Sequence, residues 1–261
     1  MKIQFTSDLH MEMRQYFELE KTNSDVIVLA GDIDTGSKGV DFAGQVSIDH
    51  NKPVVYVAGN HEFYHHDFDE VMAAIREKIE KYPNLYFLEN EGVTIGDTRF
   101  LGATLWTDFI GNGSIPQSRN MGFISMHLND HSVIRRDGGR FMPQHALNIH
   151  NESRAWLEAQ LNMPFHGHTV VVTHHGPSLK CQHKNYPKID SMATGFLSHI
   201  DDLVEKADLW IYGHSHSNLD DKVGRCRLVS NQTGYPREEG FVPGGFRPKW
   251  VIGLGEDGHE D

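Results

Sequence analysis

The apolar run Pro53-Val54-Val55-Tyr56-Val57-Ala58 leads directly into Gly59-Asn60-His61-Glu62. A β-branched run that ends in glycine and then in polar side chains is typical of a buried strand that opens into a site. In open α/β sheets, ligands bind in the crevice beyond the carboxyl ends of the strands. Taken alone, the tetrapeptide is equally well explained as an ordinary turn in which His61 caps a neighbouring element. The rest of the chain decides between these two interpretations.

Four further apolar runs end in residue types that bind metals or move protons. These runs end in Asp8-Leu9-His10, Gly31-Asp32-Ile33-Asp34, His174-His175-Gly176-Pro177 and Gly213-His214-Ser215-His216. A single histidine after a strand is usually structural, but five such ends in one chain make that a poor explanation. Carboxylate, amide and imidazole groups without a thiolate suit Mn, Fe or Zn and suit Ca poorly. The sequence therefore predicts a metal site.

The order of the predicted elements indicates an α/β fold with parallel strands. A helix over 37–50 lies between strands over 25–30 and 53–58, which is a βαβ unit. Asp67 is expected to cap the next helix, whose apolar spacing lasts until Tyr82-Pro83. Further helices are predicted over 145–161 and 193–207. Short strands are predicted over 2–7, 85–88, 92–95, 99–105, 168–173, 209–212, 225–230 and 250–254, before a disordered acidic tail over 256–261.

No proline-rich, serine-rich or charged linker divides the 261 residues, so we expect a single domain over 1–261. Residues 107–144 show little periodicity and are expected to form an irregular loop or cap over the site. Arginines concentrate there and are candidates to bind a substrate phosphate, although a solvated loop explains them equally well. These candidates are Arg119, Arg135, Arg136 and Arg140, with Tyr235 and Arg237 as further candidates near the C-terminus.

Composition limits the classes of function. The formal charge is −12, from 36 acidic and 24 basic side chains, which argues against a protein that binds nucleic acid through a broad basic surface. The two cysteines form no paired motif, so neither a disulfide framework nor a zinc–cysteine site is indicated. No leader precedes the first predicted strand, and no apolar run approaches the length that spans a membrane. We expect a soluble, cytoplasmic protein without a membrane partner.

The five polar ends together resemble the calcineurin-like metallophosphoesterase family. The family pattern is Asp-x-His, Gly-Asp, Gly-Asn-His-Asp/Glu, a single His and Gly-His-x-His, and all five motifs occur in order over residues 8–216. The resemblance implies a four-layer α/β/β/α sandwich of two mixed β-sheets flanked by helices. It also implies a dinuclear metal centre at the strand ends, holding two divalent or mixed-valence transition metals such as Mn, Fe or Zn.

The resemblance also implies roles for individual residues. Asp8, His10 and His216 would hold one ion, Asn60, His174 and His214 the other, and Asp32 would bridge them. His174 and His175 both stand where the family has one ligand. We choose His174 because it directly follows the strand, and leave His175 to orient a ligand or to contact substrate. Asp34 and Glu62 would orient ligands, and His61 would be the general acid.

The implied activity is hydrolysis of a small or medium-sized phosphomonoester or phosphodiester by a metal-activated hydroxide. A nuclease is the alternative within enzymes, and the net charge and the absence of a basic stripe count against it. A non-catalytic scaffold is the alternative outside enzymes. It would require empty ligand positions, and none of the family positions is empty.

Overall fold

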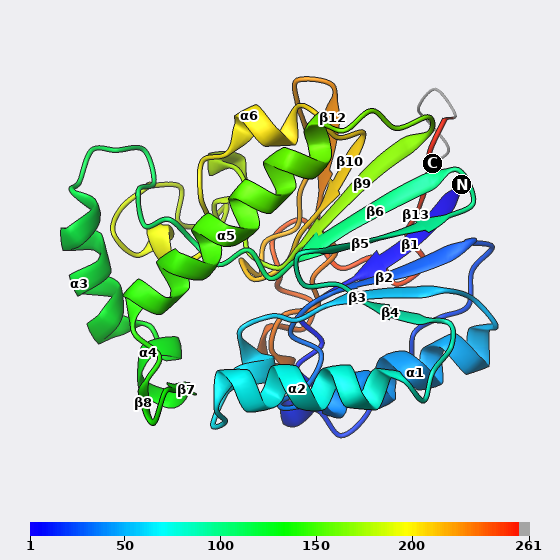
Figure 1. The fold of residues 1–261 in the computed structure, drawn as a ribbon, viewed down its shortest axis with the longest axis horizontal. Coiled ribbons are helices and arrows are strands. Elements are labelled where there is room, and N and C mark those ends of the chain that lie inside the picture. Colours follow the sequence, from blue (N-terminus) through cyan, green and yellow to red (C-terminus); the bar gives the residue numbers. More distant parts are fainter. Residues whose placement is uncertain (256–261) are drawn as a thin grey trace.

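The structure is a computed structural model that describes residues 1–255, in which two large β-sheets pack face to face with helices on their outer faces (Figure 1). The predicted disordered tail over 256–261 lies outside the described residues. The arrangement confirms the predicted four-layer α/β/β/α sandwich. In the described part of the chain, no helix is both long and apolar enough to cross a membrane.

The first sheet has the strand order β13-β1-β2-β3-β4. Its four consecutive strands are parallel and β13 pairs antiparallel with β1, so the sheet is mixed. The βαβ unit predicted around β2 and β3 is present. The strands are β1 (Lys2–Thr6), β2 (Val26–Ala30), β3 (Val54–Val57), β4 (Leu85–Phe87) and β13 (Val251–Gly253).

The second sheet has the order β11-β12-β10-β9-β6-β5, with parallel inner strands and an antiparallel strand at each edge. Sequence patterning missed β11 because three of its four residues are exposed and charged. The strands are β5 (Glu91–Ile95), β6 (Thr98–Ala103), β9 (His168–Thr173), β10 (Leu209–Ile211), β11 (Asp220–Val223) and β12 (Cys226–Val229).

Alternate residues of the inner strands face different apolar layers, as a two-residue period requires. In β2, Val26 and Val28 pack between the sheets, whereas Ile27 and Leu29 face helices α1 (Lys38–His50) and α2 (Phe68–Ile79). The outer face of the second sheet is covered by α5 (Pro143–Asn162) and α6 (Asp201–Val204). The sandwich thus presents the carboxyl ends of both sheets at one edge of the molecule.

The helices predicted over 37–50, from 68 and over 145–161 are confirmed, and Asp67 caps α2 by accepting from the backbone N–H groups of Asp69 and Glu70. The helix predicted over 193–207 is wrong for most of its length. A 3-10 turn at Ala193–Gly195 is followed by extended chain, in which Leu197 forms a bridge with Gly176, before the short α6 begins. Tertiary hydrogen bonds to Gly176 override the local helical spacing.

The irregular loop predicted over 107–144 is also wrong in its structure. The segment contains α3 (Gln117–His127), α4 (Asp130–Val133) and a hairpin of β7 (Arg135–Arg136) and β8 (Gly139–Arg140). Only Asn120 and Ile124 are buried in α3, so the helix lacks the apolar stripe that periodicity detects. Figure 1 shows these elements together to one side of the sandwich.

Candidate metal centre

The predicted ligands come together at the carboxyl ends of the strands. Three sets of three side chains place their ligand atoms within 4.8 Å of one another. His10 and Asp32 each belong to two of these sets, and Asp32 is the carboxylate of the set that also contains His174 and His214. The sets are Asp8, His10 and His216; His10, Asp32 and His61; and Asp32, His174 and His214.

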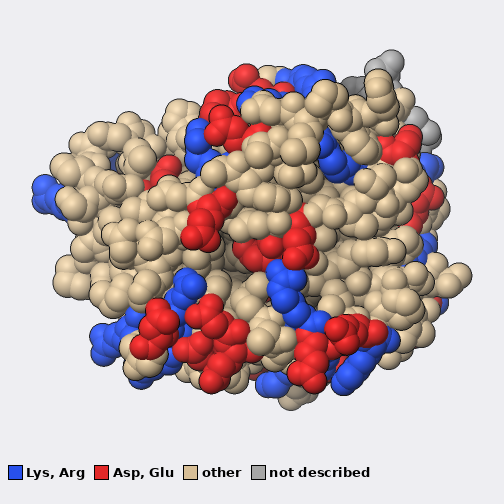
Figure 2. Space-filling view, viewed as in Figure 1, with Lys and Arg blue, Asp and Glu red and all other residues tan. Residues whose placement is uncertain are grey.

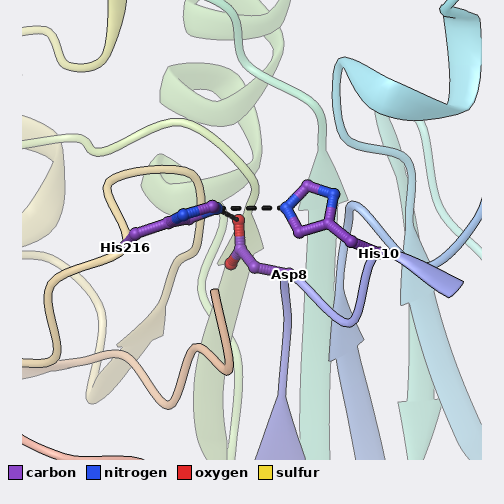
Figure 3. Close-up of side chains that lie close together, drawn as sticks. All are labelled: Asp8, His10 and His216. Carbon is purple, nitrogen blue, oxygen red and sulfur yellow. Dashed lines mark hydrogen bonds and ion pairs between the residues drawn. The ribbon is translucent and has the colours of Figure 1, made fainter. Parts of the chain in front are cut away.

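In the first set, Asp8 and His10 lie in the loop that follows β1 and His216 lies in the loop that follows β10, and their side chains point toward one another (Figure 3). Nε2 of His10 lies 3.1 Å from Nε2 of His216, which in turn lies 3.4 Å from Oδ1 of Asp8. Oδ2 of Asp32 lies 3.8 Å from Nε2 of His10. Three ligand atoms of the predicted first ion site therefore lie within 4.8 Å of one another, and Oδ2 of Asp32 lies close to one of them.

The other nitrogen of each imidazole is held by a carboxylate. Nδ1 of His10 lies 3.1 Å from Oε1 of Glu12, and Nδ1 of His216 lies 2.6 Å from Oε2 of Glu238. When each neutral ring donates its proton to a carboxylate, both Nε2 atoms are acceptors and face each other. A cation between them removes the resulting repulsion, and this carboxylate–histidine–metal arrangement is common at metal sites. The residues present therefore fit a divalent metal.

A second close pair of potential ligand atoms lies on the other side of Asp32. Nε2 of His174 is 3.0 Å from Oδ1 of Asn60 and 3.3 Å from Oδ1 of Asp32, while its Nδ1 contacts the carbonyl of Ala30 at 2.9 Å. The amide nitrogen of Asn60 donates to Oδ1 of Asp130 at 2.9 Å. With this bond in place, the amide oxygen of Asn60 faces His174, its partner in the predicted second ion site.

His61 differs from the ligands because both of its ring nitrogens have partners. Nδ1 lies 2.9 Å from Oε1 of Glu12, and Nε2 lies 3.2 Å from the hydroxyl of Tyr235. The ring stacks on Tyr64 with centroids 3.9 Å apart. His61 therefore lies beside the metal ligands without presenting a free nitrogen to either predicted ion, although it belongs to one of the three sets.

Five of the seven predicted ligands have positive φ angles, which non-glycine residues rarely adopt. Such strained residues gather at functional sites when the surrounding structure holds them in place. They lie in the loops that follow β1, β2 and β10, where the chain turns at the end of the strand. These residues are Asp8, His10, Asp32, His214 and His216.

Glu62 joins two of the motifs through the backbone. Its buried carboxylate accepts from the N–H groups of Asp32, Ile33 and Gly59 at 2.7–3.0 Å and from the Tyr56 hydroxyl at 2.8 Å. Burial, together with the nearby charge of Asp32, raises the pKa of Glu62 to about 7. Glu62 thus holds the backbone at Asp32, and its role in orienting that ligand stays a prediction. Asp34, in contrast, accepts only from its neighbour Thr35 in the described residues.

The pKa values of the imidazoles follow from their charged neighbours. Burial lowers the pKa of His216, but hydrogen bonds with Asp8 and Glu238 outweigh it and raise the pKa to about 10. Burial likewise opposes ionisation of Glu12, but its bonds with His10 and His61 lower its pKa to about 2. The metal-free site therefore holds protons, which metal binding must displace.

A cavity of about 700 Å³ opens over the ligands. Its floor includes Asp32, Asn60 and His214, and its walls come from 127–129, 182–196 and 235–238. His175 does not line it. This ring is 1% exposed and lies behind the site, where it stacks on Trp106 and has its centroid 4.2 Å from that of His214.

The candidate arginines lie elsewhere. Arg119, Arg135 and Arg140 are exposed, and Arg136 pairs with Asp69 at 3.3 Å over the ring of Phe68. None of these four arginines is among the described residues that line the cavity. The structure therefore does not support the prediction that they contact a substrate phosphate. Tyr235 does line the cavity, and Arg237 lies over its ring at 5.2 Å.

Sequence reasoning missed the carboxylates and the phenol that hold the ligands. Glu12 follows His10 by two residues, so the alternation that related Asp8 to His10 could have pointed to it. Asp130 lies in the segment expected to be irregular, and Glu238 lies far along the chain from His216. Tyr64, which donates to Asp130 at 2.7 Å, follows the Gly59-Asn60-His61-Glu62 stretch without a motif of its own.

The fold and the site define a metal-dependent hydrolase of phosphoric esters. The chain belongs to the calcineurin-like phosphoesterase family, whose family model matches residues 1–218. The chain is 24% identical over 266 residues to uncharacterized protein L509 of Acanthamoeba polyphaga mimivirus, with 90% of this chain and 92% of that protein covered.

Two solved structures show the same fold. Phosphopantetheinyl hydrolase (PptH) from Mycobacterium tuberculosis has a TM-score of 0.69 at 16% identity and covers 91% of this chain and 90% of its own. The protein TT1561 of Thermus thermophilus has a TM-score of 0.54 at 14% identity, with 88% of each chain covered. At these identities, the likeness concerns the fold alone.

Proposed function

We propose that this protein hydrolyses a small or medium-sized phosphoester at a dinuclear centre in which Asp32 bridges two transition-metal ions. The observation that supports it is the presence of two close pairs of potential ligand atoms, from His10 with His216 and from Asn60 with His174, on either side of Asp32. When bound, two such cations clamp a phosphoryl group and lower the pKa of a water between them. The ligand set, without a thiolate, favours Mn, Fe or Zn.

The chain's own residues orient the ligands and supply a proton. His61 lines the cavity, and Glu12 holds its Nδ1, which leaves Nε2 on the side of Tyr235 and the cavity. A protonated Nε2 in this place can donate to the oxygen of a leaving group. We therefore assign His61 as general acid, and the segment 107–144 as part of a cap, since His127, Leu128 and Asn129 line the cavity.

A nuclease remains the weaker proposal. Figure 2 shows Lys and Arg side chains lying beside Asp and Glu side chains on this face. The face therefore carries mixed charge, whereas a protein that binds nucleic acid typically has a continuous basic band. A scaffold that has lost its chemistry does not fit, because all seven predicted ligand positions are filled. The two buried, unpaired cysteines agree with a reducing compartment, and we place the protein in the cytoplasm.

Metal content per chain by elemental analysis tests the proposal, together with hydrolysis of an aryl phosphomonoester and an aryl phosphodiester under added Mn, Fe, Zn and Mg. We expect about two transition-metal ions per chain and turnover that a chelator abolishes and metal restores. One metal per chain with full turnover would contradict the dinuclear centre. Bound metal with no turnover of either ester would contradict the hydrolase.

A further inference from the structure

The cavity extends well beyond the metal ligands. Its volume of about 700 Å³ lies in the range of pockets that enclose whole organic ligands. The ligand side chains occupy its floor, and the segment 182–196 forms a wall above them. A phosphoryl group on the floor therefore leaves space beside it for an organic group.

The wall is mainly apolar where it meets the metal ligands. Phe196 stacks on His214 with ring centroids 4.7 Å apart, so the apolar surface begins next to a predicted ligand. Leu128, Met192 and Tyr186 continue this surface around the cavity. The Tyr186 side chain is 71% exposed, which leaves its ring available to an incoming group.

Hydrogen bonds hold this wall in place. The side chain of Gln182 donates to the carbonyls of Tyr186 and Lys188, which closes the loop. Lys184 donates from Nζ to the carbonyl of Asn218 at 2.6 Å, and Asp190 accepts from two backbone N–H groups that follow it. A surface that is already ordered loses little entropy when a ligand binds to it.

Apart from the predicted metals, the side chains that line the cavity offer little positive charge to a dianion. Apart from imidazoles, the described lining side chains carry one lysine, Lys188, against the three carboxylates of Asp32, Asp190 and Glu238, and they include no arginine. A phosphomonoester dianion usually requires fixed cations, of which arginine is the strongest. A phosphodiester carries a single negative charge and depends less on such groups.

We propose, resting on the phosphoesterase function above, that the substrate is a phosphodiester whose second ester group is apolar or aromatic and lies against Tyr186 and Met192. Water forms a new P–O bond, the P–O bond to the leaving group breaks, and the leaving oxygen receives the proton. The product is a monoester that keeps the apolar group. Its additional negative charge makes it a poor substrate for the same cavity, so hydrolysis stops there.

Three substrates with the same leaving group test this inference on the metal-loaded full chain. They are phenyl 4-nitrophenyl phosphate, methyl 4-nitrophenyl phosphate and 4-nitrophenyl phosphate. We expect kcat/KM to be about tenfold higher for the phenyl diester than for the methyl diester, since burial of an aromatic ring is favourable. We expect the monoester to be the slowest, and phenyl phosphate to accumulate as the product.

Variants test whether the difference between the phenyl and methyl diesters arises at Tyr186. Tyr186→Ala should lower the phenyl-to-methyl ratio about fivefold, whereas Tyr16→Ala, which removes an equally exposed ring outside the cavity lining, should leave it unchanged. Equilibrium binding of the slowly hydrolysed diphenyl and dimethyl phosphates gives the same comparison without turnover, and Tyr186→Ala should weaken the binding of diphenyl phosphate alone.

The outcomes separate this inference from the function on which it rests. A monoester that reacts faster than both diesters would overturn the inference and leave phosphoester hydrolysis standing. Equal values for the phenyl and methyl diesters would overturn the apolar binding surface. No hydrolysis of any of the three by protein with bound metal would overturn the proposed function itself.

Discussion

Oε1 of Glu12 lies 2.9 Å from Nδ1 of His61, and the same oxygen lies 3.1 Å from Nδ1 of His10. One carboxylate oxygen thus holds both a predicted metal ligand and the proposed proton donor. The other oxygen of Glu12 is buried and has no hydrogen-bond partner among the described residues. Metal binding and the orientation of His61 therefore depend on the same side chain.

Glu12→Gln should weaken metal binding at the His10 site about 10–100-fold, the usual effect of removing a group that orients a metal ligand. The amide of glutamine has no charge and cannot hold both protonated nitrogens as the carboxylate does. Competition with a chromophoric chelator measures the metal dissociation constants without turnover. Glu18→Gln, an exposed change outside the site, is the control. Equal dissociation constants for the two variants would show that Glu12 does not position His10.

His61→Ala should slow hydrolysis of an alkyl phosphoester by about 10²–10⁴-fold, the range for loss of a general acid. A 4-nitrophenyl ester should be affected much less, because its leaving group departs without a proton. The measurement is kcat of the wild type divided by kcat of His61→Ala, determined for each of the two esters. An equal loss on both esters would mean that His61 positions the site rather than donates the proton.

Asp130→Ala should remove one of the two metals and leave the other. Asp130 accepts from the amide of Asn60 at 2.9 Å and so keeps the amide oxygen turned toward His174. Without it, the amide nitrogen of Asn60 keeps only the longer bond to the Tyr64 hydroxyl at 3.3 Å, so the site that includes Asn60 should lose its metal first. Elemental analysis should give about one metal per chain instead of about two. The exposed Asp137→Ala is the matched control, and retention of both metals in Asp130→Ala would contradict the assignment.

The sequence alone predicts some parts of the fold and of the candidate site and misses others. The buried strands and the helices at 38–50, 68–79 and 143–162 follow from apolar periodicity. The candidate ligands are found from their place at the strand ends, and their roles remain what the family resemblance implies. The helix expected over 193–207 failed because a contact between Leu197 and Gly176 is not local. Glu238 could not be found because its role exists only through the fold, which brings it to His216 from 22 positions away.

Gly59→Ala should lower the free energy of unfolding by about 1–3 kcal/mol, as expected for a forced overlap in a packed site. A methyl group at this position would lie 2.1 Å from Oδ1 and 2.6 Å from the backbone nitrogen of Asp32. The backbone cannot move away without shifting the proposed bridging ligand, so bound metal should also decrease.

Gly122→Ala provides the control for this change. Gly122 lies in α3 with nothing within 4 Å of an added methyl group, so alanine should stabilise the helix by about 0.5–1 kcal/mol. Urea denaturation of both variants gives the comparison. Equal stabilities for the two variants would show that the close approach at Gly59 is not required.

Glu89 should make the protein less stable as the pH rises from about 4.5 to about 6. Burial raises the pKa of Glu89 to about 6 from its ordinary value of 4.5, although Thr104 donates to it from N and Oγ1 at 2.9 and 2.7 Å. Between these values the folded protein holds a proton on Glu89 that the unfolded chain has lost, so the contribution of Glu89 to stability is greatest below pH 4.5 and decreases as the carboxyl ionises.

The size of this decrease follows from the difference between the folded and unfolded pKa values of Glu89, which corresponds to about 2 kcal/mol. The free energy of unfolding of the wild type minus that of Glu89→Gln should therefore fall by about 2 kcal/mol between pH 4 and pH 7, because glutamine does not titrate. Urea denaturation in chelator at each pH measures the difference without metal loss. The control is the exposed Glu77→Gln, for which the same difference should not change with pH. If the difference for Glu89→Gln increased with pH instead, ionised Glu89 would stabilise the fold.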